Sequence, residues 1–129
     1  MQDKKSYNKN FFDSCKNALC GIIYGIKTQR NVRIQIIMVI CSIIAGIFFG
    51  LEKVEFMALM FSVILIIIVE MINTSIETTV DLFCDIYHPK AKVAKDGGAG
   101  AVVLSAINFA VVCYFLFFDK IIAMLLNVK

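Results

Sequence analysis

Residues 56–81 read Phe56-Met-Ala-Leu-Met-Phe-Ser-Val-Ile-Leu-Ile-Ile-Ile-Val-Glu-Met-Ile-Asn-Thr-Ser-Ile-Glu-Thr-Thr-Val-Asp81, an apolar half followed by a half with recurring polar side chains. The polar positions Glu70, Asn73, Glu77 and Asp81 are spaced by 3, 4 and 4 residues, which places them on one helix face. An ionisable group in a membrane helix costs roughly 2.5–3.5 kcal/mol on the insertion scale, so it usually has a partner or a function. The stripe therefore predicts a polar site at the membrane edge, suited to a lipid substrate.

The whole chain is apolar. Its 129 residues are 60% hydrophobic, and the mean hydropathy is +0.81. A soluble domain of this length would be less apolar. A helix needs about 20 apolar residues to cross the hydrocarbon core. The uncharged run Phe56–Val69 is shorter than that, so this span must include the polar end that follows it, which should face protein or the headgroup layer. The sequence predicts an all-α integral membrane protein of one domain, residues 1–129, with membrane helices at residues 32–51, 54–83 and 96–126.

A shorter helix is predicted before the first span, at residues 10–28. Its apolar side chains recur at helical spacing. They are Phe11, Phe12, Cys15, Ala18, Leu19, Ile22, Ile23 and Ile26. We expect an amphipathic helix on the surface of the cytoplasmic leaflet, which is compatible with packing against the bundle. Between the last two spans, Pro89 is expected to break the preceding helix, and residues 85–95 are expected to form a loop.

Basic residues are concentrated on one side of the predicted membrane. Before the first span lie Lys4, Lys5, Lys9, Lys16, Lys27, Arg30 and Arg33, and between the second and third spans lie Lys90, Lys92 and Lys95. The positive-inside rule then places the N-terminus and the 84–96 segment in the cytoplasm, and the 52–55 turn and the C-terminus outside. Because membrane flanking explains the basic residues, nucleic acid is not an expected partner.

The residue types allow two interpretations of the polar stripe. Carboxylates and an amide could hold Mg²⁺, and a nearby lysine could stabilise a transferring phosphoryl group. Alternatively, the same groups could tie helices together by interhelical hydrogen bonds. Spacing alone does not choose between these interpretations. For Asp81 we favour a simple ion pair, with Arg33 or with a lysine.

The run from Glu70 to Asp81 resembles the signature of the small bacterial diacylglycerol kinase and undecaprenol kinase family. Tyr87-His88-Pro89, followed by Ala94-Lys95-Asp96, is also similar to that family. The likeness covers nearly the whole chain, and Gln29-Arg30-Asn31 together with the proline after His88 is closer to the Gram-positive undecaprenol kinases. The resemblance implies a homotrimer in the bacterial plasma membrane, with active sites shared between protomers on the cytoplasmic side.

The resemblance also implies residue roles. Glu70 would be the general base for the lipid hydroxyl, and Asn73 would position the phosphate and the base. Glu77 would bind the magnesium of MgATP. Lys95 would contact the γ-phosphate, with Asp96 holding it, and His88 would contact the nucleotide.

Gln29 is a departure from the family pattern. A glutamate that shares metal binding with Glu77 is usual at this position, and glutamine offers an oxygen but no charge, so weaker metal binding is expected. The resemblance implies ATP-dependent phosphorylation of a membrane lipid alcohol, most simply undecaprenol, with diacylglycerol as the alternative. A non-catalytic helix-packing or ion-conducting membrane subunit is the alternative of another class.

Overall fold

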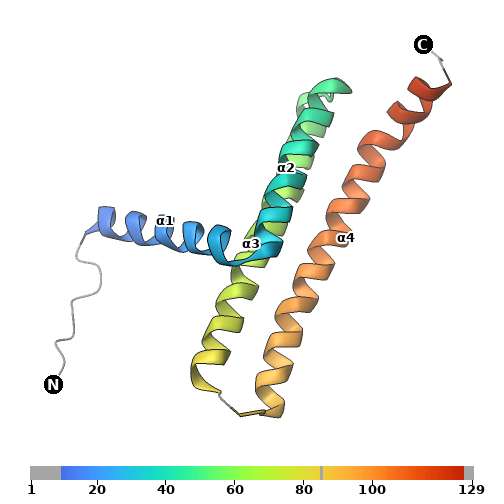
Figure 1. The fold of residues 1–129 in the computed structure, drawn as a ribbon. Coiled ribbons are helices and arrows are strands. Elements are labelled where there is room, and N and C mark those ends of the chain that lie inside the picture. The colour runs from blue at the N-terminus through green and yellow to red at the C-terminus, as the bar shows by residue number, and fades with distance from the viewer. Residues whose placement is uncertain (1–9, 85, 127–129) are drawn as a thin grey trace.

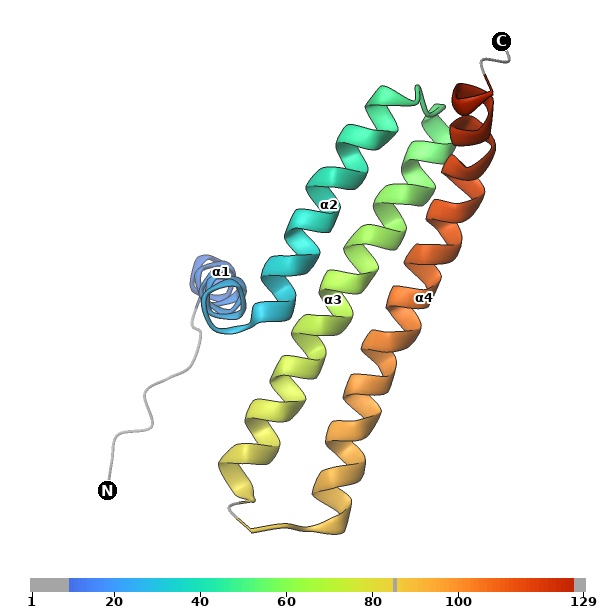
Figure 2. The same cartoon turned by 45° about the vertical axis from the view of Figure 1, so that its right-hand side comes forward.

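The computed structural model describes residues 10–84 and 86–126, which form four helices in the order α1 to α4. Their bounds are Phe11–Thr28 (α1), Arg30–Phe48 (α2), Lys53–Phe83 (α3) and Pro89–Leu125 (α4). The three long helices α2, α3 and α4 run side by side, and α1 leaves their flank at a steep angle (Figure 1, Figure 2). Residues 1–9, 85 and 127–129, which include the ends used in the predicted topology, lie outside the described residues.

Three of these helices are long and apolar enough to cross a membrane, which confirms the predicted fold class. The 19 residues of α2 extend roughly 28 Å, about the thickness of the hydrocarbon core. The 31 residues of α3 and the 37 of α4 extend about 46 and 55 Å, so both helices are longer than the core requires. Figure 1 shows the facing ends of α3 and α4 continuing past the level of α1. We call this part, residues 72–83 and 89–98, the overhang.

The break between α1 and α2 fixes where the overhang starts. Gln29 is extended (φ −96°, ψ 119°), and its backbone N–H donates to the Gly25 carbonyl at 2.9 Å. Gly25 is buried against α3, where an added Cβ would lie 2.6 Å from Met71 Sδ. The end of α1 therefore packs closely on α3, while its apolar side chains Phe11 and Phe12 remain exposed.

The turn between α2 and α3 needs a glycine. Gly50 has φ +63°, a left-handed conformation that glycine adopts without steric cost. Glu52 and Glu55 then form a capping box at the start of α3, in which the Glu52 N–H donates to Glu55 Oε2 at 2.8 Å. Lys120 of α4 reaches the same carboxylate at 3.3 Å, so this ion pair joins α3 to α4 at the end opposite the overhang.

The start of α4 differs from the prediction. The helix begins at Pro89 rather than at residue 96, and the predicted loop 85–95 is wrong for most of its length. Proline has a fixed φ and no N–H, which suits the first position of a helix. His88 is the N-cap, and its Nδ1 accepts a hydrogen bond from the Lys90 N–H at 3.2 Å. As a result, Lys95 and Asp96 lie within a helix, almost two turns after its start.

Candidate functional site

Glu70 is buried between helices, with 2% of its surface exposed. Gln35 of α2, also buried, donates from Nε2 to Glu70 Oε2 at 3.2 Å. Since a carboxylate only accepts hydrogen bonds, Gln35 must present its NH₂ group to Glu70, and its Oε1 is buried without a partner in the described part of the chain. Gln35 was not among the predicted site residues, although a single amide in the apolar run 34–51 was a usable signal.

Asn73 and Glu77 form a second amide–carboxylate pair, one turn further along α3. Asn73 Nδ2 donates to Glu77 Oε1 at 3.0 Å. The Asn73 side chain is also buried, at 6% exposure, and within residues 10–84 and 86–126 its Oδ1 has no hydrogen-bond partner. The predicted sharing of one face by Glu70, Asn73 and Glu77 therefore holds, with one amide beside each carboxylate.

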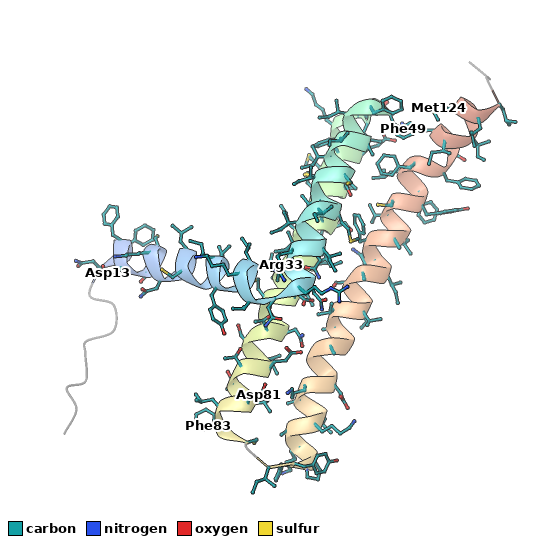
Figure 3. The ribbon with its side chains drawn as sticks, in the orientation of Figure 1. Asp13, Arg33, Phe49, Asp81, Phe83 and Met124 are labelled. Atoms are coloured by element: carbon teal, nitrogen blue, oxygen red, sulfur yellow. The ribbon has the colours of Figure 1, made fainter. Side chains whose placement is uncertain are left out.

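Asp81 and Lys95 form an ion pair across the overhang. Lys95 Nζ lies 2.8 Å from Asp81 Oδ1, and both side chains are partly exposed. Of the two predicted partners of Asp81, lysine is correct. Arg33 lies near the junction of α1 and α2, well away from the end of α3 that carries Asp81 (Figure 3). The Glu77 carboxylate also attracts the Lys95 ammonium electrostatically.

The predicted contact between Asp96 and Lys95 is wrong. Asp96 pairs with Lys92, one turn earlier on α4. The physical reason is helical spacing: side chains four residues apart lie on one face, whereas adjacent residues point in different directions. Lys95 is consequently held by Asp81 of α3, and the contact links the two helices of the overhang.

A groove with charged side chains in its lining, which we call the charged groove, lies at the end of the overhang. It has a volume of about 390 Å³, and its lining includes His88, Lys92, Lys95 and Asp96 from the α4 side. His88 is exposed there, and since its Nδ1 caps α4, only Nε2 remains for another contact. The groove therefore gathers three predicted site residues, His88, Lys95 and Asp96, beside one further lysine, Lys92.

A second groove, of about 800 Å³, is almost wholly apolar. It lies where α1, α2 and α3 meet, and its lining includes Ile26, Val32 and Met71. Glu70 precedes Met71 on α3, but its side chain faces Gln35 and does not line the groove. We call this space the apolar groove.

Glu77 and Gln29 are the predicted metal ligands. Among residues 10–84 and 86–126, no group of three or more His, Cys, Asp and Glu side chains could hold a metal ion. Mg²⁺ bound with a nucleotide needs only one or two carboxylates, because phosphates and water supply the other ligands. Glu77 fits that requirement. Gln29 is half-buried at the break between α1 and α2, and its predicted role toward a metal stays a prediction.

Comparison with known proteins gives one matching family profile and several similar sequences. The sequence profile described as prokaryotic diacylglycerol kinase matches residues 16–117. A diacylglycerol kinase of Synechocystis sp. is 38% identical over 104 residues, which are 80% of this chain and 59% of the relative. An undecaprenol kinase of Bacillus subtilis is 32% identical over 120 residues, 93% of this chain and 98% of the relative. A diacylglycerol kinase of Escherichia coli is 31% identical over 71 residues, 55% of this chain and 58% of the relative.

Proposed function

The chain belongs to the prokaryotic diacylglycerol kinase family, and we propose that it transfers the γ-phosphoryl group of ATP to the hydroxyl group of a membrane lipid alcohol. One juxtaposition carries this proposal. The carboxylates of Glu70 and Glu77 lie on one face of α3, with Glu70 buried, and an apolar groove borders the same stretch of that helix. A lipid tail suits the groove, and charged phosphates suit the overhang with its lysines.

Each side chain then has a defined task. Glu70 accepts the hydroxyl proton while the lipid oxygen bonds to the γ-phosphorus, and the bond from that phosphorus to the bridging oxygen breaks to release ADP. Asn73 holds Glu77 in place, and Lys95 stabilises negative charge on the transferred group. His88 contacts the nucleotide. Glu77 would hold Mg²⁺, which neutralises phosphate charge when it is bound.

Undecaprenol is the proposed acceptor, with diacylglycerol as the alternative. The Bacillus undecaprenol kinase is matched along 98% of its length, which supports this choice. We expect purified protein in detergent to phosphorylate undecaprenol with a higher kcat/KM than diacylglycerol, measured side by side with radiolabelled ATP. Preference for diacylglycerol would overturn the choice of acceptor. Absence of phosphorylation of both lipids would instead favour a non-catalytic membrane subunit.

The proposal includes an orientation and an assembly. The basic residues Lys27 and Arg30 at the α1–α2 junction, and Lys90 and Lys92 at the start of α4, support a cytoplasmic position for the overhang in the bacterial plasma membrane. Large apolar side chains are exposed along α2, α3 and α4, for example Ile37, Phe61 and Phe115. Lipid and neighbouring protomers of a homotrimer would cover them.

Gln29 provides a test of the proposed metal position. If it faces the metal beside Glu77, Gln29→Glu adds a negative charge that a hard cation favours, although the new carboxylate also repels Glu77. We expect activity to rise at limiting Mg²⁺, with the gain shrinking as Mg²⁺ saturates. Asn31→Asp is a matched control, because it adds the same charge at an exposed side chain two residues further on. If Gln29→Glu and the wild type have the same activity at every Mg²⁺ concentration, Gln29 does not reach the metal.

A further inference from the structure

Gly98 of α4 lies directly against the Asn73 side chain. A Cβ built on Gly98 would overlap Asn73 Oδ1, closer than Cβ contacts in proteins, and would lie 3.4 Å from Asn73 Cγ. Gly98 is the only buried glycine of α4 in the part of the chain that the structure describes. Its missing side chain therefore creates the space that the Asn73 amide occupies.

This space decides how the amide is oriented. Asn73 Nδ2 must face Glu77 to donate its 3.0 Å hydrogen bond, so Oδ1 must point the opposite way, toward α4. Oδ1 is buried there without a hydrogen-bond partner among the described residues, and the Gly98 Cα carries the C–H groups that face it. A weak Cα–H···O contact of this kind occurs at close helix–helix interfaces.

We propose that Gly98 is a positioning residue, which orients Asn73 and through it Glu77 for the phosphoryl transfer. The inference rests on the proposed function, because Asn73 and Glu77 are assigned to the nucleotide there. Gly98 itself has no functional group and touches no substrate. Its contribution is to let the amide lie flat against α4 while the NH₂ group remains directed at the carboxylate.

A Gly98→Ala substitution would act on the amide more than on the fold. The overlapping atom is the end of a side chain that can rotate, so the Asn73 amide would move and the helices need not separate. Alanine also stabilises a helix interior relative to glycine. A purely structural role and a positioning role therefore predict different results, since only the positioning role predicts lost activity without lost stability.

Glycines elsewhere on the same helix provide matched controls. An added Cβ at Gly100 or Gly97 would meet no atom within 4 Å, so each alanine variant has the same change in helix propensity without the overlap. We expect Gly98→Ala to lower kcat/KM for MgATP roughly 10- to 100-fold, the range for losing one hydrogen bond to a charged group. Gly100→Ala should retain wild-type kcat/KM, and the thermal midpoint of Gly98→Ala should equal or exceed that of the wild type.

A double-mutant cycle tests whether Gly98 acts through Asn73. In an Asn73→Ala background the overlap no longer exists, so adding Gly98→Ala should cost no further activity. Additive losses would overturn the proposal. A fall in the thermal midpoint of Gly98→Ala, with full activity of the folded fraction, would also overturn it in favour of simple helix packing.

A spectroscopic measurement separates this inference from the proposed function. The side-chain NH₂ signals of Asn73, assigned in NMR spectra by comparison with Asn73→Ser, should shift in Gly98→Ala and stay in place in Gly100→Ala. Unchanged signals in Gly98→Ala would overturn the inference whatever the protein phosphorylates. Shifted signals with no phosphorylation of either lipid by the wild type would overturn the proposed function and with it the positioning role. Shifted signals with undiminished activity in Gly98→Ala would overturn the positioning role alone.

Discussion

Replacing Glu70 with glutamine should reduce the turnover number for lipid phosphorylation by roughly 10²- to 10⁴-fold, the usual contribution of general base catalysis. Glutamine has nearly the same shape as glutamate, and its carbonyl oxygen can still accept the hydrogen bond that Gln35 donates at 3.2 Å. The buried contact between α2 and α3 is thereby kept, while the proton acceptor is lost. Steady-state kinetics with saturating MgATP and lipid would measure the change.

Glu55→Gln is a matched control for this prediction. Glu55 lies at the other end of α3, where it caps the helix and pairs with Lys120. Glutamine can retain the capping interaction, so we expect wild-type turnover and at most a small loss of thermal stability. If Glu70→Gln keeps most of its turnover, Glu70 is not the base. If the two variants lose equal thermal stability and activity, the loss reflects folding.

The helices were largely predictable from hydropathy. The exception is the start of α4, which lies at Pro89 rather than at residue 96. Long apolar runs must be buried in lipid or protein, so three spans follow from composition. Residues 89–95 contain one proline and three lysines, and lysine-rich sequence next to a proline is typical of a loop. Pro89 is compatible with both interpretations, since proline can end one helix or begin the next.

Spacing along the sequence indicates which side chains share a face of one helix, whereas it does not identify the partner of a side chain on another helix. The spacing of Asn73 and Glu77 already places their side chains together on α3. By contrast, Gln35 reaches Glu70 across 35 positions, and no local pattern determines the register of α2 against α3. For the same reason a basic partner of Asp81 could be predicted, but spacing did not distinguish Lys95 from Arg33 or another lysine.

Replacing Lys95 with alanine should reduce turnover by about 10²- to 10³-fold, the range for removing one strong donor to transition-state charge. Lys95 lies within α4, lines the charged groove and is held by Asp81 at 2.8 Å, so its ammonium is already placed before substrates bind. Lipid binding should change little, because the apolar groove lies on other helices. Turnover and the lipid KM, measured separately, would show this difference.

Two further variants decide whether Lys95 acts on the substrate or only joins α3 to α4. Asp81→Asn breaks the same ion pair from the other side, and an exposed pair of this kind contributes little to stability. A purely structural role therefore predicts equal, small effects of Lys95→Ala and Asp81→Asn, whereas a role toward the phosphoryl group predicts a much larger loss of turnover for Lys95→Ala. Lys90→Ala, which removes an exposed lysine from the same helix, should retain wild-type turnover, because the charge must stand at the groove and not merely near it.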